Sequence, residues 1–287
     1  MNFINYKGKI VSNTSMLTTN NRAFRYGDGL FESMRIFHNQ IPFLNKHLIR
    51  LHRGMKLLGY KPCDCIEENK LRNMILELCE KNEIEGSARV RLSVFRNDGG
   101  LYTPESDDFS FLIESSQMKD DTFKLDSKAL IIGIAKSVEK TIGPLSNIKS
   151  SNALNMVLAA REAKLNGWDD ALILNNKGNI AEATSSNLFV VKNNIIYTPP
   201  IEDGAMDGIM RQQIALLVKN TDYHLRIKSL STEDIENADE IFLSNAIRGI
   251  IRVVGFYEKR FYSKAANLLN KELNSFIQRY LEDMEIQ

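Results

Sequence analysis

Two kinds of hydrophobic pattern occur in both halves of this chain, and their arrangement limits the fold most strongly. Short alternating or apolar runs, typical of strands, cover residues 30–37, 88–95, 109–114, 130–135, 171–174, 187–191 and 195–198. Longer runs with helical spacing cover residues 43–58, 67–82, 151–166, a segment that begins after Gly208, and residues 264–281. The two kinds do not alternate regularly, as they would in a doubly wound sheet. The pattern therefore predicts an α+β fold.

The length of the chain predicts more than one domain. With 287 residues, the chain exceeds the size at which a single hydrophobic core usually stops growing. The polar residues 115–121 are the best candidate for a linker. We therefore expect an N-terminal domain at residues 1–118 and a C-terminal domain at residues 119–287.

The charge balance gives no reason to expect a nucleic acid or a membrane as a partner. Lys and Arg number 37, Asp and Glu number 36, and the formal net charge is +1. No stretch approaches the roughly 18 consecutive apolar residues of a membrane span. Residues 1–7 lack the basic start and the long apolar run of a signal peptide. We expect a cytoplasmic protein.

The cysteines and histidines lack the spacing of a metal site. Cys63, Cys65 and Cys79 are an odd number of cysteines, which predicts reduced thiols. The four histidines form no pair of the HExxH type. A protein-bound catalytic metal is therefore not expected.

Several segments have residues that suit a binding site, although each also has an ordinary structural interpretation. Residues 26–29, Tyr-Gly-Asp-Gly, form a turn directly before a predicted strand. Such a turn can direct Phe31, Ser33 or Arg35 into a pocket, but an ordinary hairpin corner is the more common case. Residues 244–246, Ser-Asn-Ala, similarly end an apolar strand with small polar groups, which usually cap the strand.

Two further segments are suited to an anion. Arg50 lies close to the apolar stripe of its predicted helix, where an unpaired guanidinium is costly. Its partner is then either a carboxylate of the same fold, which is the commoner case, or a ligand. Residues 207–213 resemble a glycine turn that opens a helix. Free amides at such a start can hold a phosphate, although most helix starts hold only water or a cap.

Taken in order, five segments resemble the class IV aminotransferases, also called fold-type IV pyridoxal phosphate enzymes. They are RAFRYGDGLFES at 22–33, HLIRL at 47–51, IKSSNALNMVLAAREAKLNGWDDALILNNKGNIAEATSSNLFVV at 148–191, YTPPIEDGAMDGIMRQ at 197–212 and ADEIFLSNAIRGI at 238–250. The central block is specific, because its lysine, helix, strand, turn, glutamate and Ser-Asn-Leu-Phe follow the family's order. The resemblance covers residues 3–257, nearly the whole chain.

The resemblance implies roles that no single segment reveals. It implies pyridoxal 5'-phosphate in a cleft between two domains, and a homodimer whose partner subunit completes the substrate pocket. Lys149 would bind the cofactor aldehyde covalently and later move the proton at the substrate carbon. Glu182 would lie beside the pyridine nitrogen and favour the protonated ring. Arg50 would pair with the cofactor phosphate. The other implied phosphate contacts are Ile209, Met210, Asn245 and Ala246.

Within the family, the sequence looks most like the aminodeoxychorismate lyases. Residues 24–31, 99–102, 208–212 and 244–247 are similar to theirs. Branched-chain aminotransferases usually have a glycine at the position of Ser33 and an aromatic residue near Ala153. D-amino acid aminotransferases typically have a tyrosine at the position of Phe31. Two positions depart from the family pattern, since it commonly has a glycine where Ala183 stands and a threonine where Met210 stands.

The resemblance therefore implies a 4-amino-4-deoxychorismate lyase, which releases pyruvate and 4-aminobenzoate. Aromatisation of the substrate ring supplies driving force, so the protein must mainly position the substrate and the base. The expected substrate contacts are Phe31, Ser33, Arg96, Tyr102 and Arg248, with Arg252 as a further candidate. One alternative is an aminotransferase of branched-chain or D-amino acids with a 2-oxoacid acceptor. A pyridoxal phosphate-binding protein without turnover is a remoter alternative, because Lys149, Glu182 and Arg50 are all retained.

Overall fold

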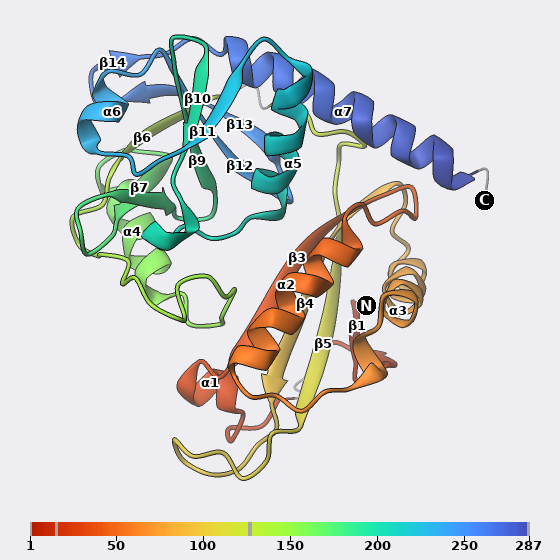
Figure 1. The fold of residues 1–287 in the computed structure, drawn as a ribbon. Helices are drawn as coiled ribbons and strands as arrows, with labels where there is room; N and C mark the ends of the chain where they lie inside the picture. Colours follow the sequence, from red (N-terminus) through yellow and green to blue (C-terminus); the bar gives the residue numbers. More distant parts are fainter. Residues whose placement is uncertain (1, 15–16, 126–127, 286–287) are drawn as a thin grey trace. The chain divides into compact units, whose positions relative to one another are not determined.

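The computed structural model describes residues 2–14, 17–125 and 128–285, and the chain divides into two compact units (Figure 1). The first unit comprises Met1–Asp121, Ile148–Asn152 and Asp283–Gln287, and the second comprises Thr122–Asn147 and Ala153–Glu282. The division thus falls after Asp121 and not after residue 118. The segment with Lys149 also belongs to the first unit, although we expected this lysine in the second domain. It does so because it pairs with a strand of the first unit.

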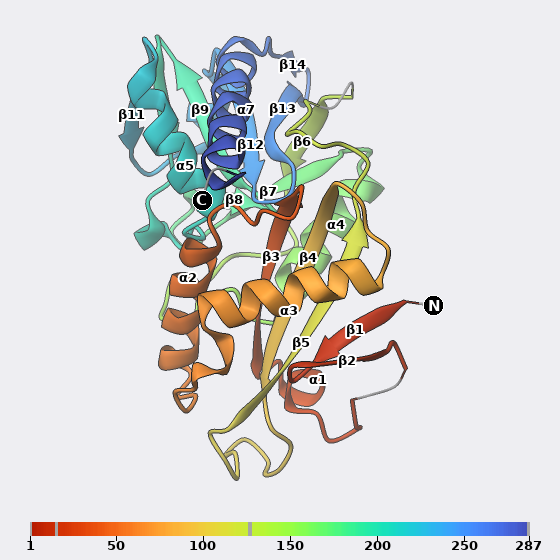
Figure 2. The same cartoon turned by 90° about the vertical axis from the view of Figure 1, so that its right-hand side faces the viewer.

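The first unit is an antiparallel sheet with helices on one face (Figure 2). The five strands lie in the order β2-β1-β5-β4-β3, so β3 is an edge strand. They are β1 Phe3–Tyr6, β2 Lys9–Ser12, β3 Gly29–Phe37, β4 Ser87–Arg96 and β5 Phe109–Gln117. The helices are α1 Arg22–Tyr26, α2 Leu44–Leu57, α3 Glu68–Lys81 and the short 3₁₀ helix η1 Asp64–Ile66.

Alternation along β3 separates the two faces of this sheet. Leu30 and Met34 join the buried core that α2 and α3 also line, whereas Phe31 and Ser33 are half-buried on the other face. Because side chains of a strand point alternately to opposite faces, Glu32 lies on the core side, between two apolar residues. The face with Phe31 and Ser33 is the less buried of the two.

The second unit contains a larger, mixed sheet. Its order is β11-β10-β9-β12-β13-β6-β7-β8, with β14 paired to β13. The strands are β6 Leu130–Ile134, β7 Asp170–Leu174, β8 Ile180–Ala183, β9 Asn187–Lys192, β10 Ile195–Thr198, β11 His224–Ile227, β12 Glu240–Asn245, β13 Gly249–Phe256 and β14 Lys259–Arg260. The helices are α4 Leu154–Leu165, α5 Ile209–Leu217, α6 Thr232–Glu236 and α7 Lys264–Glu285, with 3₁₀ helices η2 Ile201–Asp203 and η3 Val218–Asn220. An antiparallel sheet in one unit and a mixed sheet in the other confirm the predicted α+β class.

Helix α4 is apolar on two sides. Ala159 and Ala163 are buried in a small core with residues of β7. The opposite side of the helix carries large apolar side chains that are exposed in the single chain. They are Leu154, Val157, Leu158 and Leu165.

The cysteines differ from the prediction of three reduced thiols. Cys63 and Cys65 form a disulfide, whereas Cys79 is free and buried. The pair lies at the beginning of η1, where the turn brings two residues that are close in sequence to a Cα–Cα distance of 5.3 Å. The prediction of reduced thiols rested on the odd number of cysteines and on the absence of metal spacing, neither of which excludes a bridge between Cys63 and Cys65.

Candidate active site

The backbone of Lys149 is fixed against the free edge of β3. The Phe31 amide donates to the Lys149 carbonyl over 2.9 Å, and the Ser151 amide donates to the Gly29 carbonyl over 2.8 Å. A Cβ on Gly29 would lie 2.9 Å from the Ser151 hydroxyl, so glycine allows this close approach. Edge strands have unpaired backbone groups, and the lysine segment satisfies those of β3.

The Lys149 amine lies against an aromatic ring that also contacts an arginine. Its Nζ is 4.5 Å from the centre of the Phe31 ring, and the Arg91 guanidinium carbon is 3.8 Å from the same centre. Arg91 is the cross-strand partner of Ser33, and its Nε donates to Ser93 Oγ over 3.2 Å. Sequence analysis did not select Arg91. Its place on the Phe31 face follows from strand pairing, which the sequence does not show.

The partner of Arg50 is a carboxylate of the same fold, the commoner of the two alternatives. Arg50 Nε donates to Glu32 Oε1 over 2.8 Å, and Arg50 Nη2 donates to Glu32 Oε2 over 2.6 Å. His47 Nδ1 lies 2.7 Å from the same Oε2. Burial opposes ionisation of Glu32, but Arg50 and then His47 outweigh it and lower the pKa of Glu32 to about 2. Glu32 is therefore an ionised, deeply buried carboxylate.

Arg96 is held by oxygens of the protein. Its Nε donates to Asp28 Oδ2 over 3.0 Å, its Nη1 to Asp107 Oδ1 over 2.5 Å and its Nη2 to the Leu58 carbonyl over 2.5 Å. Asp28 also accepts from Arg22 Nε over 2.9 Å. A hollow of about 270 Å³ adjoins this cluster. Its lining residues include Arg22, Tyr26, Asp28, Arg96, Tyr102 and Pro104.

Arg22 organises the loop that carries Tyr102. Its Nη1 donates to the carbonyls of Gly99 and Leu101 over 2.8 and 2.6 Å, and its Nη2 donates to that of Tyr102 over 3.3 Å. The side chains of Leu101 and Tyr102 are highly exposed. Arg22 thus fixes the backbone of the loop by hydrogen bonds to its carbonyls, while the side chains of Leu101 and Tyr102 stay exposed.

In the second unit, both oxygens of Glu182 have partners. The Lys140 ammonium donates to Glu182 Oε1, and the Met206 amide donates to Oε2 over 2.9 Å. Both charged side chains are buried. Lys140 was not selected from the sequence, because it is separated from Glu182 by 42 residues and only the pairing of distant loops brings them together. The Lys140 ammonium and the Met206 amide together give this buried carboxylate a partner for each oxygen.

The start of α5 is connected to Glu182 through Met206. The Met206 carbonyl accepts from Asn187 Nδ2 over 2.7 Å. Asn187 in turn abuts Gly208, where a Cβ would lie 1.9 Å from Asn187 Oδ1. Gly208 precedes α5 in extended backbone, without a side-chain hydrogen bond to the helix start. The amides of Ile209 and Met210 thus lie at a helix N-terminus that lacks a side-chain cap, as a phosphate requires.

Asn245 shapes the turn beside this helix start. Its Oδ1 accepts from the amides of Ile247 and Arg248 over 3.1 and 2.9 Å, and its Nδ2 donates to Ser186 Oγ over 3.1 Å. Ala246 is half-buried in the same turn. Ser244 Oγ is buried and lacks a hydrogen-bond partner among the described residues. An unsatisfied hydroxyl, a helix start and a turn of small residues fit a phosphate. Arg248 lies close enough to Asp170 to lower its pKa, although burial raises that pKa more strongly.

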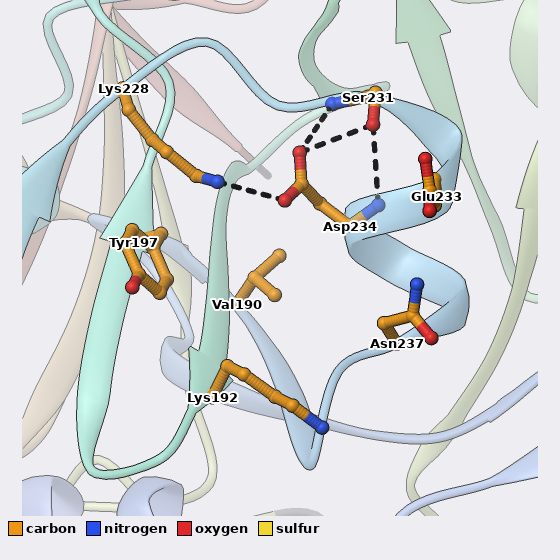
Figure 3. A pocket seen from close by; sticks show the side chains of 8 residues that line it. All are labelled: Val190, Lys192, Tyr197, Lys228, Ser231, Glu233, Asp234 and Asn237. Atoms are coloured by element: carbon orange, nitrogen blue, oxygen red, sulfur yellow. Dashed lines mark hydrogen bonds and ion pairs between the residues drawn. The ribbon is translucent and has the colours of Figure 1, made fainter.

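Another hollow of the second unit lacks the features of an active site. It has a volume of about 330 Å³ and lies between β9, β10 and α6 (Figure 3). Its two lysines have carboxylate partners, since Lys228 Nζ is 2.8 Å from Asp234 and Lys192 Nζ is 2.9 Å from Asp239. Asp234 also accepts from the Ser231 amide, closing the capping box of α6 (Figure 3). These charges stabilise the local fold.

Among residues 2–14, 17–125 and 128–285, no group of three or more His, Cys, Asp or Glu side chains is arranged to hold a metal ion. Within the same ranges, no helix combines the length and the apolarity that crossing a membrane requires.

Comparisons with known proteins agree with this arrangement of residues. The model of the family described as amino-transferase class IV matches residues 29–256. Aminodeoxychorismate lyase of Bacillus subtilis (strain 168) is 27% identical over 273 residues, which are 92% of this chain and 92% of that protein. D-alanine aminotransferase of Bacillus licheniformis is 24% identical over 276 residues, which are 90% of this chain and 89% of that protein.

The fold has a close counterpart among solved structures. Branched-chain amino acid aminotransferase of Escherichia coli superposes with a TM-score of 0.85 at 23% sequence identity, covering 94% of this chain and 92% of that chain. This likeness extends over both units and confirms the fold predicted from the resemblance. Because the family model matches most of the chain, from Gly29 to Phe256, the chain belongs to the class IV aminotransferases, which are enzymes that use pyridoxal 5'-phosphate.

Proposed function

We propose that this enzyme is a 4-amino-4-deoxychorismate lyase, which releases pyruvate and forms 4-aminobenzoate. The observation that carries the proposal is the contact of Lys149 and Arg91 with one ring, that of Phe31. An amine, a guanidinium and an aromatic surface together suit a planar ring that carries a carboxylate. The 27% identity to the Bacillus subtilis lyase over 92% of both chains supports the same assignment.

Different residues would bind different parts of the cofactor. Lys149 would bind the cofactor aldehyde, and Arg50 would pair with its phosphate. Glu182 would pair with the pyridine nitrogen, and the start of α5 with Asn245 and Ala246 would supply further phosphate contacts. Pyridoxal phosphate, when bound, accepts the electron pair left on the substrate carbon after proton removal.

The amine of Lys149 then acts as the base. It removes the proton from the ring carbon that bears the amino group. The bond between the ring and the enolpyruvyl oxygen breaks, the ring becomes aromatic, and the leaving enol gains a proton to become pyruvate. Since aromatisation drives the reaction, positioning of ring and amine is the main task of the protein.

We assign the substrate carboxylate to Arg91 in preference to Arg96. Each guanidinium nitrogen of Arg96 donates to a protein oxygen, so binding a substrate would require it to leave Asp28 or Asp107. Arg91 already lies against the Phe31 ring, which Lys149 also contacts. Ser33 neighbours Arg91 across the strands, and Tyr102 and Arg248 remain candidates for contacts with other parts of the substrate.

We further propose a homodimer. The apolar stripe on α4, formed by Leu154, Val157, Leu158 and Leu165, is a large exposed patch of a kind that usually marks an interface. Leu101 and Tyr102 add a second exposed apolar site on the loop that Arg22 holds. A second copy of the chain is the expected occupant, because the class IV resemblance implies a partner subunit at the substrate pocket.

An aminotransferase is the second candidate. The 24% identity to D-alanine aminotransferase over 90% of this chain favours it, and the same residues would serve. In that case Lys149 would return the proton to the cofactor carbon, and a 2-oxoacid would later accept the amino group. The two functions differ in their products, because only the lyase releases pyruvate and 4-aminobenzoate together.

The deciding experiment is an assay of the purified, cofactor-loaded enzyme with aminodeoxychorismate. We expect equal amounts of pyruvate, measured with lactate dehydrogenase, and 4-aminobenzoate, measured by fluorescence. Lys149→Ala should abolish both products, and Arg91→Met should raise KM by roughly 10- to 100-fold, the scale of a lost charged hydrogen bond. Arg89→Met, on the same strand, is the matched control with unchanged KM.

Two outcomes would contradict the lyase function, and a third would contradict only the role of Arg91. Amino transfer from D-alanine or a branched-chain amino acid, without pyruvate release from aminodeoxychorismate, would establish the aminotransferase. Cofactor binding without turnover of any of these substrates would indicate a binding protein. An unchanged KM for Arg91→Met with normal turnover would remove Arg91 from the carboxylate site while leaving the lyase intact.

A further inference from the structure

Glu32 contacts Arg50 through two separate atoms, and this fixes the plane of the guanidinium. Glu32 Oε1 accepts from Nε over 2.8 Å and Oε2 accepts from Nη2 over 2.6 Å. A two-point contact of this kind restrains rotation of the guanidinium as well as its position. Glu32 stands on β3 and Arg50 on α2, so the contact also ties the helix to the strand that holds Lys149.

His47 fixes the carboxylate in turn. It lies one helical turn before Arg50 on the same face of α2, and its Nδ1 is 2.7 Å from Glu32 Oε2. Because Glu32 is ionised, this nitrogen must carry the hydrogen and donate it. Burial lowers the pKa of His47 more strongly than the hydrogen bond and the charge of Glu32 raise it, and the cations of Arg50 and Lys149 lower it further. His47 is therefore a neutral donor with Lys149 among its charged neighbours.

The charge of Glu32 does not by itself favour a bound phosphate. A carboxylate beside Arg50 cancels part of the field that would attract a dianion. If attraction were the only requirement, an unpaired Arg50 near Lys149 would serve better. The carboxylate must therefore contribute through geometry, or through folding alone. If Glu32 acts through geometry, removing its charge should weaken cofactor binding. If it acts through folding alone, removing its charge should leave cofactor binding unchanged or strengthen it.

We propose that Glu32 is a positioning residue which, braced by His47, holds Arg50 in the orientation that receives the cofactor phosphate. The inference rests on the proposed function of Arg50 as the phosphate partner. It adds two residues that make no contact with the cofactor and act through Arg50. The pair thereby links the phosphate end of the cofactor to β3, whose edge fixes the backbone of Lys149.

The test is the affinity of the apoenzyme for pyridoxal phosphate, measured by absorbance titration. Glu32→Gln keeps the shape of the side chain and removes its charge, and should raise Kd by about tenfold, the scale of one lost charged hydrogen bond. An unchanged or lower Kd would overturn the proposal. If Glu32 only neutralised Arg50, its replacement would leave the full charge of Arg50 to attract the phosphate. Glu240→Gln, a change at another buried carboxylate, controls for lost stability and should leave Kd unchanged.

A pair of His47 variants tests the brace and covers the case in which Glu32→Gln does not fold. His47→Asn places an amide donor near the position of Nδ1, and His47→Leu removes the donor. We expect Leu to weaken cofactor binding by roughly tenfold and Asn to restore most of it, as one hydrogen bond to a charged group predicts. Equal binding by both variants would overturn the role of His47 as a brace.

Phosphorus NMR distinguishes positioning from a general structural effect. The phosphate of the cofactor has a second pKa of about 6 in water, and a fixed guanidinium should keep it dianionic well below that value. We expect the bound phosphate resonance to be constant with pH in the wild type and to titrate in Glu32→Gln. A constant resonance in both would oppose the proposal. Borohydride reduction of the wild type, with the pyridoxyl group mapped to Lys149, tests the proposed function separately.

Discussion

At Glu32, two opposing effects act on one carboxyl group. Burial raises its pKa, and Arg50 followed by His47 lowers it, with a net value of about 2 against an ordinary value of 4.5. A carboxylate with a lowered pKa stabilises the folded state fully above the ordinary value. That stability is lost as the pH falls from there towards the folded pKa. The acid limb of the stability curve should therefore depend on Glu32.

This predicts the effect of Glu32→Gln on acid unfolding. The free energy of unfolding of the wild type should fall between pH 4.5 and about 2, and the variant should show a smaller slope in this range. Urea titrations at a series of pH values measure the slope. Glu77→Gln, at an exposed position on α3, is the control that should keep the wild-type slope. A variant with the full wild-type slope would contradict the assignment.

Gly208 is required for space and not for its backbone conformation. Its φ is −70°, which any residue adopts, but a Cβ would lie 1.9 Å from Asn187 Oδ1. Gly208→Ala should displace Asn187, and with it the Met206 contact to Glu182. We expect a loss of about 1–3 kcal/mol in unfolding free energy, as overpacking usually costs, and weaker cofactor binding. Gly143→Ala has open space around its Cβ and should be neutral in both measurements.

The sequence predicted the residues of the site unevenly. Lys149, Arg50 and Glu182 lie in segments that match the family in order, although none was distinctive alone. Lys140 could not have been found, because its partner Glu182 is 42 residues away. Arg91 follows from the register that pairs it with Ser33, which requires knowledge of the sheet. Which arginine meets the substrate therefore depends on pairing, not on composition.

Glu240 stabilises the beginning of helix α7. This buried carboxylate on β12 accepts from the amides of Lys264, Ala265 and Ala266 over 2.8, 2.7 and 2.8 Å. The first amides of a helix have no partner within the helix and carry its positive partial charge. One glutamate of β12 thus serves as a cap for three amides at the start of α7.

We predict that Glu240→Gln lowers the free energy of unfolding by about 1–2 kcal/mol, the range measured for lost helix caps. Thermal unfolding followed by circular dichroism measures the change, and cofactor affinity should be unaffected. Glu272→Gln, on α7 itself, tests whether the effect belongs to the cap. Equal stability of the two variants would show that the three amides find other partners.

Strong periodicity predicted the bounds of helices well. Where the predicted bounds were wrong, pairing with a distant strand was the reason. Helices α2 and α3 begin and end within a residue of their predicted bounds. Residues 115–117 were expected in a linker, but they extend β5 because Ala88, Arg89 and Val90 of β4 pair with them. Ser151 was expected in a helix and instead pairs with Gly29. The short strands β1, β2, β8 and β11 and helix α6 have too few residues to show a period.

The exposed stripe of α4 predicts the state of the whole molecule. Val157 and Leu165 are 60% and 77% exposed in the single chain, and charges at these positions should prevent a second copy from covering them. We expect Val157→Glu with Leu165→Glu to shift the protein from dimer to monomer in sedimentation velocity. Lys56→Glu, at an exposed position on α2, should leave the dimer intact. A wild-type monomer, or a dimer in the double variant, would contradict the proposed interface.

The pairing of residues 148–152 with β3 has a consequence for how the gene can be divided. A chain cut after Asp121 would give an N-terminal half that contains Arg50 but lacks Lys149, together with an uncovered strand edge prone to aggregation. The C-terminal half would carry the amine without the surface that orients it. We therefore expect neither half to be active by itself, although the boundary between the two compact units follows Asp121. Fusion, duplication or exchange of these halves between relatives must keep the crossing segment matched to its strand.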